Sequence, residues 1–214
     1  MEHMDRRQVL KGAVGLGVAG VLYSPQAALA HGRKGARYRW DIVNLGFPGP
    51  LCAREGGRAS SKAQDGARIT ITGSGTFRDG RECSRKVTGG GTWTITPGTP
   101  PTPAAGSGTF KVAHFVSFEL APGTVPVADC IGDAADARAG RLTVTIRFSD
   151  GSEGVLEIGC RLAGSPDEIM EGITATKGFA TFWNHEEPAA GVDGNRTLFH
   201  VLRKHDDDDD DDDD

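Results

Sequence analysis

Apart from one short N-terminal stretch, the sequence has no long apolar segment, and none approaches the ~20 residues that a helix needs to cross a bilayer. It contains no closely spaced Cys-x-x-Cys pair, which argues against a structural zinc site. The Gly-x-Ser-x-Gly motif of many serine hydrolases is also missing. Basic residues do not cluster, so nothing predicts a nucleic-acid-binding face. Several common classes of membrane, zinc, hydrolase and nucleic-acid-binding protein are therefore not indicated.

The first 30 residues have the pattern of a removable export signal. Two arginines, Arg6 and Arg7, precede an uncharged apolar stretch at 12–22, which is too short to span a membrane. Residues 28–30, Ala-Leu-Ala, form a small-x-small cleavage site. A charged segment, a modest apolar segment and a small-residue cleavage site together predict cleavage after residue 30.

The run Arg-Arg-Gln-Val-Leu-Lys at 6–11 resembles the twin-arginine (Tat) signal. Asp5 stands where that signal usually has Ser or Thr, and Val9 replaces the more common Phe. The resemblance covers the signal region and implies that bacteria or archaea export the protein already folded. We therefore expect a periplasmic or extracellular location.

Charge divides the remaining chain into a folded body and an acidic tail. Cleavage after residue 30 leaves 184 residues, which suffices for one domain with a single core. The last nine residues, 206–214, are all aspartate and must remain solvated because neighbouring carboxylates repel one another. The whole chain carries a formal charge of −5, whereas the body at 31–205 carries +3. We expect a signal at 1–30, a domain at 31–205 and a disordered tail at 206–214.

All four cysteines follow the signal, at Cys52, Cys83, Cys130 and Cys160. An even number of cysteines in an exported protein predicts two disulfides. Of the three possible pairings we favour Cys52–Cys83 with Cys130–Cys160, because each pair encloses a compact strand-and-turn segment. Each bridge would stabilise the fold by about 2–4 kcal/mol, mainly by restricting the unfolded chain.

Apolar and polar residues alternate along most of the body, which is typical of strands with one buried face. In the segment 140–148, alternate residues from Leu142 to Phe148 are apolar. Asp150 and Gly151 then predict a hairpin turn before the segment 154–162. The same alternation occurs at 37–45, 67–77, 91–96, 108–120, 173–183 and 196–202. The sequence therefore predicts about eight antiparallel strands.

A short motif, Gly-x-Gly-Thr-aromatic, occurs three times at intervals of one strand and its turn. The copies lie at 73–77, 89–93 and 106–110. The glycines permit a bulge or sharp bend, and the aromatic residue would then point inward. A phosphate-binding loop is the alternative, but it needs a following helix, and strand-like residues follow instead.

Helical signals are few. The segment 164–172 has Ser165 as a cap, Pro166 in the first turn and Gly172 as a stop, which predicts a helix of one to two turns. The segment 133–140 is a second candidate. The Pro- and Gly-rich segment 97–108 predicts an exposed loop.

These patterns predict an all-β protein with one or two very short helices. We favour a single antiparallel β-barrel of about eight strands, and a two-sheet β-sandwich is the alternative. The glycine-rich turns and the Gly-Phe-Ala-Thr-Phe-Trp run at 178–183 resemble the allene oxide cyclase and dirigent group of β-barrels. That resemblance implies a barrel fold and assigns no functional residue.

Six aromatic side chains are candidates to line a ligand cavity, since small barrels often hold one apolar ligand. They are Phe110, Phe115, Phe118, Phe179, Phe182 and Trp183. The alternative, which we favour, is that these residues simply fill the core.

A polar cluster follows the last of these aromatics. His185 together with Glu186 or Glu187 could act as an acid–base pair in catalysis. The run is not a zinc-protease motif, because Ala189 occupies the position of the second histidine. Glu-Glu-Pro is also typical of an exposed turn, which is the interpretation we favour.

Two metal sites are conceivable at the ends of the mature chain. Cleavage after residue 30 would give His31 a free amine, which together with its imidazole could chelate Cu²⁺. His114, His185 or His200 could then add a ligand. At the other end the tail, represented by Asp206, Asp207, Asp208 and Asp209, would bind Ca²⁺ weakly through carboxylate oxygens. A purely solubilising tail is the alternative, and we assign no cofactor.

The leading functional hypothesis is a secreted, disulfide-stabilised barrel that binds a small apolar ligand or a surface partner without catalysis. The alternatives are a cyclase- or isomerase-like enzyme that uses the barrel cavity, a cation-attracting structural surface protein, and a copper-binding protein. The sequence predicts neither a nucleic-acid partner nor a membrane span after signal removal, and it does not indicate an oligomeric state.

Overall fold

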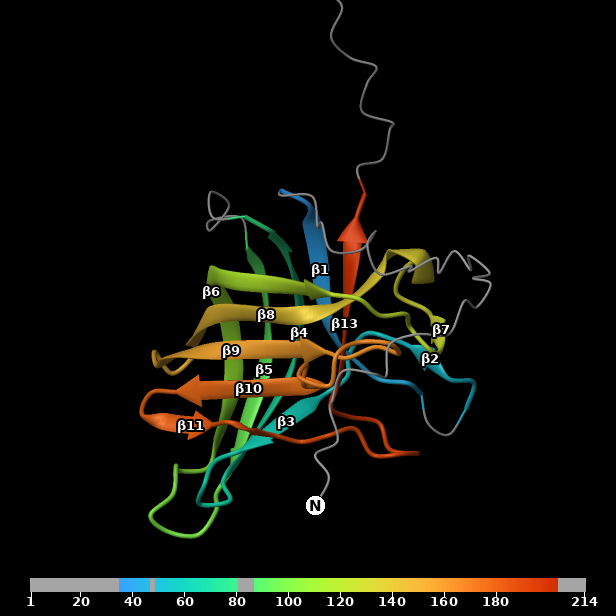
Figure 1. The fold of residues 1–214 in the computed structure, drawn as a ribbon. Helices are drawn as coiled ribbons and strands as arrows, with labels where there is room; N and C mark the ends of the chain where they lie inside the picture. The colour runs from blue at the N-terminus through green and yellow to red at the C-terminus, as the bar shows by residue number, and fades with distance from the viewer. Residues whose placement is uncertain (1–34, 47–48, 81–86, 204–214) are drawn as a thin grey trace, which may run out of the picture.

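The computed structural model describes residues 35–46, 49–80 and 87–203, and it is almost entirely β-sheet (Figure 1). The strands are β1 (Arg37–Val43), β2 (Cys52–Ala53), β3 (Ala59–Lys62), β4 (Arg68–Arg78), β5 (Thr88–Thr96), β6 (Gly106–Ala121), β7 (Ala128–Asp129), β8 (Ala137–Phe148), β9 (Glu153–Cys160), β10 (Gly172–Lys177), β11 (Ala180–Phe182), β12 (Asn184–His185) and β13 (Arg196–Leu202). The prediction of an all-β protein is confirmed.

Every segment with alternating residues contains a strand, but the segment 173–183 contains two. It folds as a hairpin of β10 and β11, with Lys177 paired to Ala180. The sequence did not indicate β2, β3, β7 and β12, which are two to four residues long. Strands this short are too brief for an alternating pattern to be recognised.

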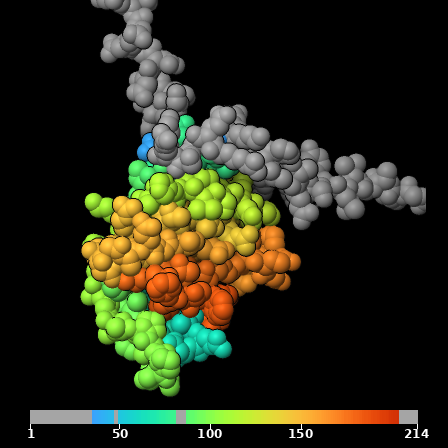
Figure 2. Space-filling model, turned by 90° about the vertical axis from the view of Figure 1, so that its left-hand side faces the viewer, coloured from blue at the N-terminus to red at the C-terminus, as the bar shows by residue number. Residues whose placement is uncertain are grey.

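The strands of the large sheet pair antiparallel in a continuous order. From β4 the order runs through β5, β6, β8, β9 and β10 to β11. Figure 2 shows part of this order on one face, where the surface changes from green through gold to orange along β6, β8, β9 and β10. On the other side of β4 lies β1, which pairs with β13, and β13 pairs in turn with the start of β8. The pairings from β1 through β4, β5, β6, β8 and β13 therefore return to β1.

Two strand edges are shared between partners. The second half of β4 pairs with β1, and its first half pairs with β3. In β8, Ala137 and Arg138 pair with β13, whereas the residues from Gly140 onward pair with β9. Because β9 and β13 each pair with part of the same edge of β8, these two strands diverge from one another. Their backbone N–H and C=O groups at the point of divergence need other hydrogen-bond partners.

Aromatic side chains pack against one another in the core beneath the large sheet. The rings of Tyr38 and Phe77 stack with centroids 5.2 Å apart, and Phe118 lies 4.8 Å from Phe77 and 5.2 Å from Phe199. Trp40 has no exposed surface. Burial of these large apolar surfaces stabilises the sheet, since each fully buried aromatic contributes roughly 1.5–3 kcal/mol.

The glycine motif brings neighbouring strands close together below the Trp40 ring. In the pairing of β4 with β5, Gly75 lies opposite Gly89. A Cβ atom on Gly75 would lie 2.2 Å from the carbonyl oxygen of Thr88 and 2.7 Å from Trp40 Nε1. The aromatic residues that close the three copies, Phe77, Trp93 and Phe110, are all buried, as predicted.

The prediction of a helix at 164–172 is wrong. This segment forms turns, with one hydrogen bond of 3.2 Å from Ile169 N–H to the Pro166 carbonyl. Ser165 does not cap a helix, because its hydroxyl donates to the Pro122 carbonyl at 2.8 Å and accepts from Leu162 N–H at 3.0 Å. Tertiary hydrogen bonds thus replaced the local ones that the cap pattern suggested.

The second candidate helix is reduced to one turn of 3₁₀-helix at Ala134–Asp136. Asp133 caps it by accepting a hydrogen bond from Ala135 N–H at 2.8 Å, and β8 begins directly afterwards. The loop expected at 97–108 is confirmed for 97–105, where most residues are exposed, and β6 begins at Gly106. None of the described segments forms a helix long and apolar enough to cross a bilayer.

The predicted disulfide pairing is wrong. Cys52 is bonded to Cys130, with Cα atoms 5.8 Å apart, and Cys160 is a buried free thiol. Cys83 lies outside the described residues. The bridge joins β2 to β7, which form a separate parallel pair. Proximity along the chain misled the prediction, because 78 residues separate the two bonded cysteines.

Candidate functional site

A cavity of about 250 Å³ lies between the β1–β13 pair and the segments that carry β2 and β7. We call the segment 122–130, which includes β7, the strap. Val125, Pro126 and Val127 of the strap line the cavity. The other apolar lining residues are Val43, Leu45, Ala53, Leu162, Pro188 and Leu198. The polar lining residues are Arg161, Glu171, Glu187, Arg196 and Thr197. The cavity lining therefore combines apolar and charged side chains.

Strand alternation explains which side chains of the β1–β13 pair reach the cavity. Register places Asp41 opposite Leu198 and Val43 opposite Arg196. These residues share one face of the pair, since side chains alternate along a strand. Trp40 and Ile42, which alternate with Asp41 and Val43 along β1, lie on the opposite face, in the core. The cavity is thus on the strap side of β1 and β13, away from the aromatic core.

Glu171 bridges the place where β13 and β9 diverge. One carboxylate oxygen accepts from Thr197 N–H of β13 at 2.7 Å, and the other accepts from Arg161 N–H, just after β9, at 2.5 Å. The carboxyl group thus takes the place of a missing strand partner for two backbone groups. Burial raises the pKa of Glu171 to about 8 even though these hydrogen bonds and Arg196 and Arg161 lower it. Near neutral pH the buried carboxyl is therefore mostly protonated.

Thr197 and Cys160 reinforce the same junction. The Thr197 hydroxyl donates to the Gly159 carbonyl at 2.6 Å, and the Cys160 thiol donates to the Thr197 carbonyl at 3.2 Å. Burial, and secondarily Glu171, raises the pKa of Cys160 well above its usual value. A buried thiol that stays protonated is a poor nucleophile, so Cys160 has a packing role.

The polar cluster predicted from the sequence lies beside this cavity, but its members separate. His185 Nε2 and Glu187 Oε1 are 2.8 Å apart, and Arg161 Nη2 lies 3.4 Å from the other oxygen of Glu187. Glu186 instead forms ion pairs with Lys62 at 2.7 Å and Arg68 at 2.8 Å. Burial alone would raise the pKa of Glu186, but these two cations hold it below its usual value. Of His185, Glu186 and Glu187, Glu187 alone lines the cavity, and His185 contacts Glu187.

The six aromatic residues predicted as a cavity lining do not line the described cavity. Phe110 and Phe182 are buried, and Phe115 and Phe118 pack against the core. Phe179 and Trp183 are exposed on the outside of the molecule. Four of the six therefore belong to the core or pack against it, whereas Phe179 and Trp183 are surface residues, which the core-filling interpretation did not expect.

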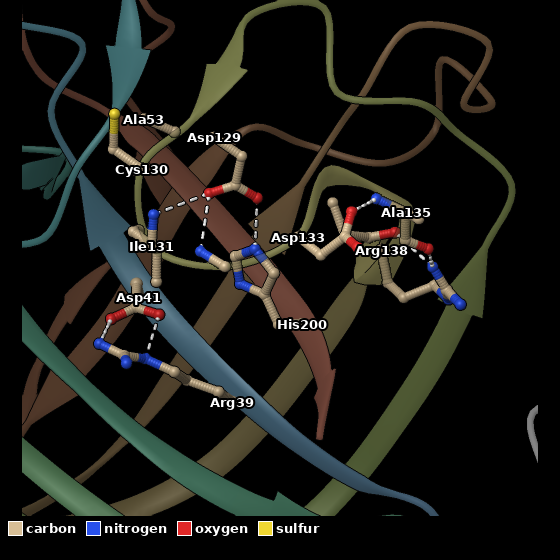
Figure 3. A network of polar contacts seen from close by, with 12 residues as sticks. Arg39, Asp41, Ala53, Asp129, Cys130, Ile131, Asp133, Ala135, Arg138 and His200 are labelled. Atoms are coloured by element: carbon tan, nitrogen blue, oxygen red, sulfur yellow. Dashed lines mark hydrogen bonds and ion pairs between the residues drawn. The ribbon is translucent and has the colours of Figure 1, made fainter. Parts of the chain in front are cut away.

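A buried hydrogen bond between His200 and Asp129 holds the strap against β13 (Figure 3). His200 Nε2 and Asp129 Oδ2 are 2.6 Å apart, and both side chains are at most 4% exposed. The other oxygen of Asp129 accepts from the N–H groups of Ile131 at 2.9 Å and Gly132 at 3.2 Å. Burial alone would raise the pKa of Asp129, but the hydrogen bonds from His200 and these two N–H groups keep it below its usual value.

An ion pair between Arg39 and Asp41 of β1 lies beside the contact of His200 with Asp129 (Figure 3). Arg39 makes two hydrogen bonds of 2.8 Å to the carboxylate of Asp41, and it also contacts Glu55. Burial raises the pKa of Asp41 above its usual value although Arg39 lowers it. The contact of Asp129 with His200 and the Cys52–Cys130 bridge together hold the strap in place, and the strap forms part of the cavity lining.

The described part of the chain contains no candidate metal centre, because no three or more of its His, Cys, Asp or Glu side chains are grouped so that they could hold an ion. The predicted copper site at His31 lies outside the described residues, as do the calcium candidates Asp206, Asp207, Asp208 and Asp209. Both sites stay predictions.

Sequence reasoning missed the polar lining residues other than Glu187. Glu171 lies inside the segment that was expected to be helical, and Arg161 lies three residues before that segment. Arg196 and Thr197 belong to a strand recognised for its apolar alternation. A glutamate directly before a strand carries no periodic signal. Its role depends on the two backbone N–H groups that tertiary structure places beside it.

Comparison with known proteins finds no matching family model, no matching curated protein and no matching solved structure. The geometry of the cavity and its walls is therefore the basis for assigning a function.

Proposed function

We propose that this protein is an exported binding protein that holds one small organic molecule in the cavity between the β1–β13 pair and the strap. The observation that carries the proposal is that the cavity lining combines mostly apolar side chains with a few charged ones. Ligand sites typically combine apolar surface with a few polar groups that orient the ligand.

The dimensions of the cavity limit the ligand. A volume of about 250 Å³ lies just below the range of roughly 300–1,000 Å³ that is usual for drug-sized ligands. The ligand is accordingly small, with one compact apolar group and one polar group. This interpretation keeps the binding function expected from the sequence but moves it from the barrel interior to the strap side of β1 and β13.

Export and a closed barrel complete the proposal. The Cys52–Cys130 bridge supports an oxidising compartment, as expected for an exported protein. The pairing circuit of β1, β4, β5, β6, β8 and β13 supports a barrel rather than a sandwich. Such a barrel, packed with aromatic side chains, is a rigid support for a site on its outer side.

A test is to fill the cavity and measure ligand binding. Ligand-observed NMR with a library of small organic molecules would identify binders of the full chain. Val127→Trp places a bulky side chain in the cavity wall, whereas Val116→Trp makes the same change at an exposed position of β6. We expect binding to be lost in V127W and kept in V116W. Absence of any binder, or equal binding by both variants, would refute the proposal.

Acid–base catalysis in the same cavity is a second candidate function. It is favoured by a carboxyl that is mostly protonated near pH 7, Glu171, and by the ionisable Glu187–His185 pair at the same cavity. Proton exchange at the α-carbon of small ketones in D₂O, followed by NMR, would test it. Exchange that is faster than in buffer and lost in Glu187→Gln would support catalysis, and no acceleration would exclude this reaction.

A further inference from the structure

The charged side chains of the cavity lining carry a net positive charge near neutral pH. Arg161 and Arg196 contribute two guanidinium groups, and Glu187 contributes one carboxylate. Glu171 adds little negative charge there, because its buried carboxyl is mostly protonated. This net positive charge favours an anionic ligand group.

Arg161 is the cation best placed to bind such a group. Its backbone is fixed by the hydrogen bond from its N–H to Glu171, while its side chain is about one-third exposed and lines the cavity. Its contact with Glu187 is a single interaction at 3.4 Å, near the upper limit for a hydrogen bond. Glu187 meanwhile has His185 as a second partner at 2.8 Å. A ligand carboxylate could therefore replace Glu187 at Arg161 and leave Glu187 paired.

We propose that the ligand is a small monocarboxylate with a compact apolar body, and that Arg161 binds its carboxylate. The apolar body lies against apolar lining residues such as Val127, Leu162 and Leu198. Guanidinium groups bind carboxylates through two parallel hydrogen bonds, which is stronger than the single long contact with Glu187. This inference rests on the proposed binding function and adds the chemical class of the ligand.

Four probes that share one ring separate the carboxylate from other polar groups. They are cyclohexanecarboxylate, cyclohexanecarboxamide, cyclohexylmethanol and cyclohexylmethylamine, each titrated calorimetrically into the full chain. We expect the carboxylate to bind at least about 10-fold more tightly than the amide and the alcohol. The reason is that only the carboxylate forms hydrogen bonds to Arg161 in which both partners are charged, and such bonds are stronger than bonds to a neutral group. We expect the amine to bind most weakly.

Variants of Arg161 test its role. Arg161→Gln should lower carboxylate affinity to the level of the amide, and Arg161→Lys should restore part of the loss because it keeps the charge without the planar geometry. Arg147→Gln, which changes an exposed arginine paired with Glu153 on β8 and β9, is the matched control and should bind like the wild type. Thermal unfolding of each variant would confirm that it folds.

Three outcomes would overturn the inference. They are equal or tighter binding of the amide, alcohol or amine by the wild type, an R161Q variant that keeps the preference for the carboxylate, and binding of none of the four probes. The proposed binding function is judged separately, by the library screen with V127W and V116W. A binder of another class found there would leave the function standing and reject the carboxylate.

Discussion

Glu171 shows how one side chain can serve both the fold and the cavity. Its two oxygens are hydrogen-bond acceptors for backbone N–H groups of Thr197 and Arg161, and the same carboxyl borders the cavity. Buried carboxyls are costly unless they are hydrogen-bonded, so the two backbone donors explain why the fold tolerates this one. Its raised pKa is the consequence of burial that these bonds only partly offset.

The variant Glu171→Gln tests whether the Glu171 carboxyl stabilises the fold through these two hydrogen bonds. The amide can accept a hydrogen bond with one end only, so one backbone N–H loses its partner, at a cost of about 1–3 kcal/mol. The folded pKa is about 8 and lies above the usual value of 4.5, so the folded protein binds more protons than the unfolded chain between these values. The stability contribution of Glu171 is therefore greatest below pH 4.5 and falls as the pH rises to about 8.

Denaturant unfolding of the wild type and E171Q between pH 4.5 and 9 would check this. We expect the stability difference between the two proteins to shrink with rising pH and to level off above about pH 8. Glu168→Gln, at an exposed position three residues away, is the control and should show no such trend. A difference that is constant across the range would mean that Glu171 ionises normally in the folded protein.

At the scale of elements, the glycine motif allows β4 and β5 to pass beneath Trp40. Gly75 and Gly89 face each other across the strand pair, and both lie against the indole ring. A side chain at either position would collide with the backbone of the neighbouring strand as well as with the ring. The repeat therefore marks a close approach of strands.

Gly75→Ala should accordingly destabilise the protein. The new Cβ would meet the Thr88 carbonyl at 2.2 Å and the Gly89 Cα atom at 2.6 Å, both of which are backbone atoms. Overpacking of this kind typically costs about 1–3 kcal/mol. Thermal unfolding would show a lowered Tm for G75A, whereas Ser74→Ala on the same strand removes atoms and should change Tm little. Equal Tm values for the two variants would contradict the close packing.

The strap is the second important element, and a disulfide closes it onto β2. Cys52 and Cys130 are bonded, and the adjacent Asp129 is paired with His200 of β13. Figure 1 places β2 and β7 beside each other at one side of the large sheet, as their pairing requires. The wall of the cavity therefore depends on residues far apart in the sequence.

A double-mutant comparison tests the bond between Cys52 and Cys130. Cys52→Ser and Cys130→Ser should each lower the free energy of unfolding by about 2–4 kcal/mol, because either change removes the same cross-link. The double variant should cost little more than one single variant. Peptide mapping of the unreduced protein should find residues 52 and 130 in one linked fragment. A fragment that links residues 52 and 83 would restore the pairing expected from the sequence.

At the scale of the whole molecule, the aromatic core and the described cavity lie on opposite faces of the β1–β13 pair. A ligand bound in the cavity contacts the strap side of this pair and leaves the aromatic core unchanged. Ligand binding should therefore stabilise the strap more than the core strands, which hydrogen exchange can resolve.

The predicted export concerns the whole chain and has its own test. Replacing Arg6 and Arg7 with lysine should abolish export, since the twin-arginine resemblance rests on this pair. Cell fractionation would follow the location of the protein, and the mass of the exported form would show whether cleavage follows residue 30. Unchanged export of the Lys-Lys variant would assign the leader to another route.

The strands could be predicted from local patterns, and the candidate site could not. The alternation in segments such as 140–148 and 196–202 reports which side chains face the core, and this information is contained in the segment itself. The cap pattern at 164–172 was equally clear, yet the Ser165 hydroxyl donates a tertiary hydrogen bond to the Pro122 carbonyl instead of capping a helix. A local pattern fails when a distant partner competes for the same polar group.

The sequence by itself determined the all-β class, the main strands and the inward direction of the motif aromatics, because each depends on the period of two along a strand. Tertiary structure alone decided that Cys52 bonds to Cys130, that Cys160 stays a free thiol and that Glu171 joins β13 to the end of β9. These features require contacts between residues that are tens of positions apart. Which distant segments meet depends on strand order, and no local period encodes that order.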